Sequence, residues 1–337
     1  MADARDVTTA AKVAFLKQPE AYAQRPSRVE TIETHMSWLF LTDRFVYKMK
    51  KPVRTANLDY STLGLRRRNC DVEVRLNRRL SPHVYLGSVA LTMDAAGELS
   101  LSGPGKPVEW LVHMRRLPAR DMLDQRVAAA SASASAVEPA AHLLAQFYAH
   151  AVAVDWSART YLERLRVDIN ASADELAKTD YGLPARLVAD VQSQLLARLR
   201  RLGDALARRA DGGHIVEGHG DLRPEHICLC SPPAIIDCLE FRRSLRLLDP
   251  LDELSFLALE LERLDAADVA DWFFSPYRAI TGDRPVPELI VFYKSYRALL
   301  RAKVAVWHNH DVTDLTPWIR KAVDYLQRAR TQLSTGR

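Results

Sequence analysis

Short runs rich in β-forming residues dominate the first third of the chain and predict a small sheet. The expected strands cover residues 28–32, 37–41, 45–50, 84–93, 99–101 and 109–114, with turns at 42–44, 94–97 and 103–105. Two helical patterns accompany these strands, one before the first strand and one between the third and the fourth. We expect a short helix over residues 6–18 and a long, basic-faced helix over residues 60–80, opened by Asp59 or Ser61 as its N-cap.

After Arg116 the spacing of apolar residues becomes helical. Helices are expected over residues 138–153, 157–177, 185–210, 250–263, 266–274, 286–307 and 313–333. The small, uncharged stretch 127–137 predicts a loop or a frayed helix. One stretch, 212–241, breaks the helical pattern with β-like pieces at 214–216, 227–229 and 234–237. The chain therefore reads as a mostly β region of about 85 residues followed by a mostly helical region.

Composition narrows the class of protein. The 337 residues are 48% hydrophobic and 26% charged, which excludes a disordered or collagen-like chain. A net charge of +5, spread along the chain, is too mild to predict nucleic-acid binding. The four cysteines are too few for a disulfide framework, the first residues lack an apolar signal core, and no run approaches the roughly 18 apolar residues that cross a bilayer. We expect a soluble, cytoplasmic protein without membrane contact.

The candidate chemistry lies in the stretch that interrupts the helices. It contains His219-Gly-Asp-Leu-Arg-Pro-Glu-His226, and 16 positions after Asp221 a second carboxylate, Asp237, closes an apolar run. In-line phosphoryl transfer needs one carboxylate to orient or deprotonate the attacking hydroxyl and another to hold Mg²⁺ across the phosphates. The alternative is that both residues only cap turns.

These residues carry a resemblance to a known family. The segment from His219 to His226 resembles the catalytic loop of the aminoglycoside phosphotransferases, usually HGDLHPGN, and the protein-kinase loop HRDLKPEN. Ala234-Ile-Ile-Asp237 resembles the family's I-D-W segment, and Asp249-Pro-Leu-Asp-Glu-Leu254 its D-P-x-x-D-L-A helix start. Within the family, the sequence is similar to an uncharacterised kinase-like branch that is often fused to an ATPase. That similarity rests on three segments: Glu33-Thr-His-Met-Ser37, Tyr47-Lys-Met-Lys-Lys-Pro52 and Leu63-Gly-Leu-Arg-Arg-Arg68.

The resemblance implies a two-lobed, protein-kinase-like α+β fold with ATP between the lobes. A helical arm would cover residues 1–27, a small antiparallel-sheet N-lobe 28–113 and a mainly helical C-lobe 114–337. It implies an ATP- and Mg²⁺-dependent phosphotransferase that acts on a hydroxyl of a small molecule, with Asp221 as catalytic base, Asp237 as metal ligand and Arg223 toward the γ-phosphate. Because no G-x-x-x-x-G-K-[ST] motif occurs in the chain, any ATPase would be a separate partner.

One position departs from the family pattern. His226 stands where the family has an Asn that binds the second metal, and imidazole suits Mg²⁺ poorly. The expected glycine-rich phosphate loop is also missing. A nucleotide-binding regulatory module or pseudokinase is therefore the alternative function. Glu240 could supply a further metal oxygen or serve in an ordinary ion pair, and zinc held by His226 and nearby cysteines is a weaker alternative.

The remaining nucleotide contacts are predicted in the N-lobe. Strand alternation puts Val46, Lys48 and Lys50 on one face, and Lys48 is favoured for the phosphates because Val46 would then meet adenine. We expect Glu73, or else Asp71, as the partner of Lys48. The phosphate turn would be near Ser37, and backbone groups near His113 and Met114 would bind the adenine edge, as the resemblance implies.

Overall fold

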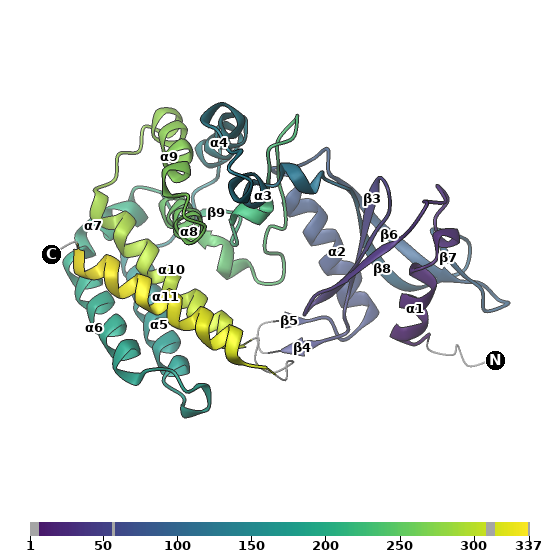
Figure 1. Ribbon diagram of the computed structural model, residues 1–337, viewed down its shortest axis with the longest axis horizontal. Helices are drawn as coiled ribbons and strands as arrows, with labels where there is room; N and C mark the ends of the chain where they lie inside the picture. The colour runs from purple at the N-terminus through teal and green to yellow at the C-terminus, as the bar shows by residue number, and fades with distance from the viewer. Residues whose placement is uncertain (1–6, 56–57, 308–313, 336–337) are drawn as a thin grey trace. The chain divides into compact units, whose positions relative to one another are not determined.

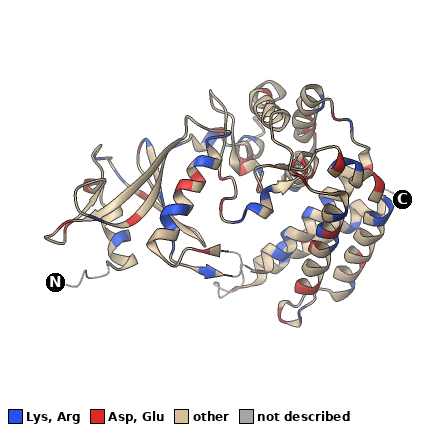
Figure 2. Cartoon of the chain, turned by 180° about the vertical axis from the view of Figure 1, so that it is seen from behind, with Lys and Arg blue, Asp and Glu red and all other residues tan. Residues whose placement is uncertain are grey.

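The computed structural model describes residues 7–55, 58–307 and 314–335. Two compact units are present, Met1–Gln125 with Glu225–Ser244, and Arg126–Pro224 with Leu245–Arg337. The first unit therefore runs beyond the boundary expected at residue 113 and takes in a segment from the middle of the chain. Figure 2 shows acidic and basic residues dispersed over both units, as expected for a chain without a charged tail.

The first unit is built on a six-stranded antiparallel sheet of order β1-β2-β3-β8-β6-β7. The strands are β1 (Glu30–Glu33), β2 (Ser37–Leu41), β3 (Phe45–Lys50), β6 (Tyr85–Met93), β7 (Leu99–Leu101) and β8 (Lys106–Arg115). Each of them lies where alternation predicts a strand. Two short hairpins, β4 (Arg54–Thr55) with β5 (Leu58–Asp59) and β10 (Ile227–Cys228) with β11 (Ala234–Ile235), complete the unit.

Two helices cover opposite faces of this sheet (Figure 1). Helix α2 (Leu63–Asn77) packs on β6 and β8, and α1 (Thr9–Leu16) packs on the other face. The N-cap of α2 is Thr62, whose side chain accepts from the N–H of Leu65. The prediction of Asp59 or Ser61 was wrong because the Asp59 carboxylate accepts from the N–H and hydroxyl of Ser61, which closes a turn just before the helix.

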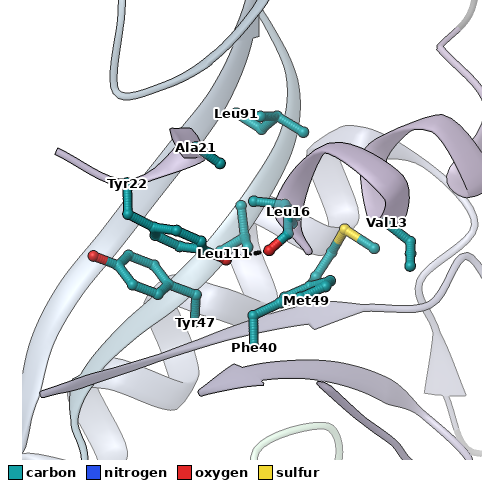
Figure 3. Close-up of a cluster of buried hydrophobic side chains, with 9 residues drawn as sticks. All are labelled: Val13, Leu16, Ala21, Tyr22, Phe40, Tyr47, Met49, Leu91 and Leu111. Atoms are coloured by element: carbon teal, nitrogen blue, oxygen red, sulfur yellow. Dashed lines mark hydrogen bonds between the residues drawn. The ribbon is translucent and has the colours of Figure 1, made fainter. Parts of the chain in front are cut away.

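The α1 face of the sheet has its own apolar core, shown in Figure 3. Leu16 of α1 and Tyr22 pack on Tyr47, Met49 and other buried residues, and the Tyr22 hydroxyl donates to the Leu16 carbonyl at 2.6 Å. A buried carboxylate, Glu109 of β8, joins Lys12 of α1 to Arg66 of α2. The N-terminal helix is therefore an integral part of the first unit.

The second unit is mainly helical. Its helices are α4 (Ala134–Ala149), α5 (Ala158–Leu176), α6 (Ala185–Arg201), α7 (Gly203–Asp211), α8 (Pro250–Arg263), α9 (Ala267–Thr281), α10 (Pro287–Trp307) and α11 (Thr316–Thr335), and α3 (Leu123–Ala128) lies at the boundary of the two units. Helices α10 and α11 pack side by side, as do α5 and α6 (Figure 1). One small ladder joins β9 (Val216–Glu217), just before His219, to β12 (Leu247–Leu248). None of the helices in the described ranges combines the length and the hydropathy that a bilayer crossing needs.

Candidate active site

Lys48 lies between two carboxylates of the first unit. Its Nζ is 2.9 Å from Oε1 of Glu73 on α2 and 2.8 Å from Oδ1 of Asp237, two residues after β11. Asp71, the other candidate partner, is exposed on the opposite side of α2. The structure therefore brings Lys48 and Glu73 together with Asp237, three residues that the sequence singled out.

A second lysine of the same strand shares the Glu73 carboxylate. Lys50 Nζ is 2.6 Å from Oε2 of Glu73 and 2.5 Å from Oε1 of Glu240, which also accepts from the Tyr60 hydroxyl at 2.6 Å. The side chains of Lys50 and Glu73 are fully buried, and that of Glu240 is 11% exposed. Glu240 is thus an ion-pair acid in this structure, which is the second of the two roles considered for it.

Electrostatics keep this group of side chains charged. Burial acts against the charge on Lys48 and Lys50, but the surrounding carboxylates outweigh it and raise the pKa of both ammonium groups well above the ordinary value. Burial also acts against the charge on Glu240, yet Lys50 and Lys48 lower its pKa. Lys48, Lys50 and Glu240 are therefore held in their charged forms.

Asp237 has a backbone conformation that few residues adopt. Its φ is +61°, in the left-handed region where Asp and Asn are tolerated better than most side chains. Its N–H donates to the Tyr85 hydroxyl at 3.0 Å, and the next N–H, of Cys238, donates to Oδ1 of Asn77 at 2.8 Å. Contacts from β6 and α2 thus fix the loop that presents the Asp237 carboxylate.

The Asp237 carboxylate suits a magnesium ion. It is 44% exposed, and Mg²⁺ is commonly bound by one or two carboxylates together with substrate phosphates and water. His226 Nε2 lies 3.7 Å from Oδ2 of Asp237, so the two predicted metal residues are neighbours. The part of the chain that the structure describes contains no group of three or more His, Cys, Asp or Glu side chains arranged for a metal ion. The described residues therefore offer no ligand set for a structural zinc ion.

Asp221 and Arg223 belong to the second unit. Oδ2 of Asp221 is 3.1 Å from Nε of Arg223, and its Oδ1 is 3.8 Å from Nη1 of Arg301 on α10. The Asp221 side chain is 24% exposed. The proposed base is therefore accessible and lies between two guanidinium groups, of which the sequence indicated only Arg223.

A buried carboxylate on α8 binds the start of the loop that contains Asp221. Oε2 of Glu253 accepts from the N–H of His219 at 2.9 Å and from the Tyr148 hydroxyl at 2.6 Å, and its Oε1 accepts from the N–H of Gly220 at 2.5 Å. A Cβ at Gly218 would lie 2.7 Å from this carboxylate, so the close approach requires glycine. The role of Glu253 was missed, although it occupies the second acidic position of the D-P-x-x-D motif.

Asp249 begins α8, as its Asp-Pro sequence predicts. Its side chain accepts from the N–H of Leu251 at 2.9 Å, and Pro250 is the first helical residue. The same buried carboxylate pairs with Arg209 of α7 and accepts from the Tyr293 hydroxyl of α10. Three helices are thereby joined next to the loop that carries Asp221.

The other predicted contacts lie on or near the sheet. Val46 packs with Val112 and Met114 on the Lys48 face, as alternation predicts. Ser37 is buried at the start of β2, and its N–H donates to the Thr34 side chain in the β1–β2 turn. His113 and Met114 are paired on both edges of β8, with β3 and β6, and the His113 ring stacks on Tyr47 on the α1 face. Their backbone groups are thus directed to neighbouring strands, because the sheet continues to Arg115.

No family model matches the chain. It is 34% identical over 286 residues to an uncharacterised protein of Mycobacterium tuberculosis (strain ATCC 25618 / H37Rv), and to one of Mycobacterium bovis at the same identity and length. These residues are 82% of this chain but 54% of each relative. The chain thus spans about half the length of the curated relatives it matches.

Solved structures resemble the whole chain. Choline kinase LicA from Streptococcus pneumoniae has a TM-score of 0.53 at 16% identity, over 91% of this chain and 93% of that one. A thermostable mutant of aminoglycoside phosphotransferase APH(4)-Ia, solved with AMP-PNP and hygromycin B, has a TM-score of 0.52 at 12% identity, over 92% and 94%. A choline/ethanolamine kinase family protein from Mesorhizobium loti has a TM-score of 0.50 at 15% identity, over 96% and 98%.

The chain has the protein-kinase-like fold of these small-molecule kinases. The fold class expected from the sequence is therefore confirmed. The first unit is an antiparallel sheet with packed helices and the second unit is mainly helical, as in that fold class.

Proposed function

We propose that this protein belongs to the aminoglycoside phosphotransferase family and transfers the γ-phosphate of ATP to a hydroxyl of a small molecule. The observation that carries the proposal is the contact of Lys48 with both Glu73 and Asp237. A charged lysine fixed by a helix carboxylate, next to a partly exposed aspartate, combines a phosphate-binding cation with a metal-binding oxygen. The use of ATP favours action in the cytoplasm.

The residues of the candidate site have different roles in the proposed reaction. Lys48 binds the phosphates of the nucleotide, Val46 contributes to the apolar surface for adenine, and Asp237 binds Mg²⁺, which neutralises charge on the phosphates. Asp221 orients the acceptor hydroxyl and takes its proton. Arg223, fixed at 3.1 Å from Asp221, is a permanently charged donor for the transferred phosphate.

The test is nucleotide binding followed by a transfer screen. ATP should bind with an affinity that depends on Mg²⁺ or Mn²⁺, measured by calorimetry. Phosphate transfer to sugars, amino alcohols and aminoglycosides would then be followed by ADP release. Metal-independent ATP binding without turnover of any acceptor would contradict a phosphotransferase. A separate P-loop ATPase partner stays a prediction.

A regulatory nucleotide-binding module is the second candidate, and one observation favours it. His226 faces the Asp237 carboxylate, at 3.7 Å, with an imidazole where a hard oxygen ligand would suit Mg²⁺ better. If the enzyme is limited by this ligand, His226→Asn should keep or raise the Mg²⁺-supported transfer rate. If His226 orients the loop by its own donor, the same change should lower the rate.

Both proteins should be assayed for transfer and ATP consumption in Mg²⁺ and in Mn²⁺. A regulatory module would bind ATP but transfer no phosphate in either form or with either metal. Unchanged ATP affinity in His226→Asn would show that the histidine is not needed for nucleotide binding itself.

A further inference from the structure

Positive charge gathers around the proposed base within the second unit. Asp221 faces Arg223 at 3.1 Å and Arg301 at 3.8 Å, through its two carboxylate oxygens. A single carboxylate thus lies beside two guanidinium groups, although one of them would suffice to hold it in place.

Arg301 is not saturated by the protein. Its guanidinium lies 5.7 Å from the centre of the Phe256 ring, and its buried Nε has no hydrogen-bond acceptor among residues of the described ranges. Burial acts against its charge, yet Asp221 and Tyr325 raise the pKa of Arg301, so the group stays cationic. A buried guanidinium with an unused donor is costly unless another acceptor is supplied.

Lys321 of α11 adds a third cation. It is half-buried, and in the described part of the chain it pairs with no carboxylate; its Nζ lies 5.7 Å from the centre of the Trp318 ring. Helix α11, which carries Lys321, packs along α10, which carries Arg301. Burial, and then the charges of Arg301 and Arg263, lower the pKa of Lys321; Glu260 opposes them, and Arg223 adds a smaller lowering.

Two nearby acids pair with Arg263 of α8. Glu260 and Asp324 each lie 3.0 Å from Arg263, and Glu260 also accepts from the Tyr325 hydroxyl at 2.7 Å. Asp221 is the ion-pair partner of Arg301, and the charge of Glu260 also acts on Arg301 and Lys321, but Lys321 has no carboxylate within ion-pair distance in the described part of the chain. A site of this charge attracts anions and repels cations.

We propose that the acceptor molecule carries an anionic group, a carboxylate or a phosphate, which Arg301 and Lys321 bind while its hydroxyl lies at Asp221. This inference rests on the proposed function and adds the class of acceptor to it. The hydroxyl oxygen forms the new bond to the γ-phosphorus, the bond from that phosphorus to the ADP oxygen breaks, and the hydroxyl proton passes to Asp221. An acceptor with a permanent positive charge, such as choline, would be unfavourable here.

Acceptor molecules of similar size but different charge test whether the charge of the acceptor determines its use. Glycerol 3-phosphate and glycerate carry an anionic group, glycerol is neutral, and 3-amino-1,2-propanediol is cationic. With ATP and Mg²⁺, the anionic pair should have the higher kcat/KM, and comparison of its two members distinguishes phosphate from carboxylate. A preference for the neutral or the cationic molecule would overturn the inference and leave the phosphotransferase intact.

Variants of Lys321 locate the binding site. Lys321→Gln should raise KM for the anionic acceptor about 10- to 100-fold, the usual effect of losing a hydrogen bond to a charged group, and leave KM for glycerol and for ATP unchanged. Lys321→Arg should restore much of the loss. Arg320→Gln, which removes an exposed cation on the same helix, is the matched control and should behave like the unaltered protein. An equal effect of Lys321→Gln on all acceptors would contradict the proposal.

Binding without ATP separates the two hypotheses. Glycerol 3-phosphate, titrated by calorimetry at millimolar concentrations, should bind to the unaltered protein and to Lys48→Met but much more weakly to Lys321→Gln. Binding of this kind without any transfer would uphold the anion site and refute the phosphotransferase. Transfer to uncharged acceptors without Lys321-dependent anion binding would do the reverse, and failure of both measurements would refute both.

Discussion

Lys48 and Lys50 differ in what surrounds them more than in where they lie. Both are on one face of β3 and both contact Glu73, but Lys48 also reaches Asp237, whereas Lys50 is sealed between Glu73, Glu240 and Tyr60. Sequence alternation places the two lysines together and favours Lys48, and the structure brings Lys48 to the predicted Glu73. That Lys50 shares this carboxylate could not be predicted, because side-chain reach and the approach of Glu240 depend on tertiary contacts.

Substitutions of Lys48 and of Lys50 should therefore have different effects, one on ATP binding and the other on stability. Lys48→Met should weaken ATP binding strongly with a modest loss of stability, because Glu73 keeps Lys50 as a partner. Lys50→Met removes the fully buried cation between Glu73 and Glu240 and should lower the free energy of unfolding by about 3 to 5 kcal/mol. Calorimetry with ATP and urea unfolding of both variants provide the two measurements.

A charge-balanced variant is the control for Lys50. Lys50→Met combined with Glu240→Gln removes one charge of each sign and should recover part of the lost stability. If the double variant recovers stability but binds ATP more weakly than Lys48→Met does, the phosphate-binding role would move to Lys50.

Asp237 combines a charge with a left-handed backbone, and two substitutions separate these properties. Asp237→Asn preserves a side chain that tolerates φ near +60° and removes the charge, so it should abolish the metal dependence of ATP binding with little loss of stability. Asp237→Ala should show the same loss of metal dependence and an additional destabilisation of about 1 to 2 kcal/mol. ATP affinity measured with and without Mg²⁺ checks this; retained metal dependence in both variants would refute the assignment.

At the scale of elements, the loop that contains Asp221 depends on α8. Glu253 accepts two backbone N–H groups of this loop and the Tyr148 hydroxyl, so its carboxylate faces three donors. Glu253→Gln turns an NH₂ group toward those donors and should cost about 1 to 3 kcal/mol in stability. Because the loop carries Asp221, we expect kcat to fall while KM for ATP stays nearly unchanged.

Tyr148→Phe is the matched control for this prediction. It removes one donor to the same carboxylate and leaves both loop contacts, so it should reduce stability but change kcat little. If Tyr148→Phe lowers kcat as much as Glu253→Gln does, general destabilisation rather than loop position would explain both.

The bounds of the helices and strands show which elements sequence patterns can predict. Long periodic segments such as α5, α8 and α10 lie close to their predicted bounds, since their apolar faces repeat over several turns. The single helix expected over 185–210 divides into α6 and α7 at Gly203. The low-complexity stretch 127–137 contains the end of α3, a loop over 129–133 and the first turn of α4. The two-residue strands β9 and β12 are too short for alternation, so their pairing is a tertiary feature.

At the scale of the whole molecule, the proposed tasks divide between the two units. Lys48, Glu73 and Asp237 belong to the first unit, and Asp221, Arg223 and Arg301 to the second. The sequence indicated every residue of these sets except Arg301, because strand alternation and short motifs are local patterns, whereas Arg301 and the buried supports come from distant segments. Nucleotide binding and phosphate transfer should thus be separable by mutation.

Asp221→Asn makes this separation measurable. Asn preserves the shape of the side chain and an oxygen for Arg223, so folding and ATP affinity should stay nearly unchanged, while transfer to an acceptor should fall about 100-fold or more, because a positioned base acts mainly in the transition state. Asp190→Asn, at an exposed position on α6, is the control and should retain full activity. Single-turnover transfer and ATP calorimetry on both variants supply the comparison. Loss of ATP binding in proportion to the loss of transfer would show that Asp221 supports the nucleotide rather than the chemistry, and undiminished transfer would remove it from the site altogether.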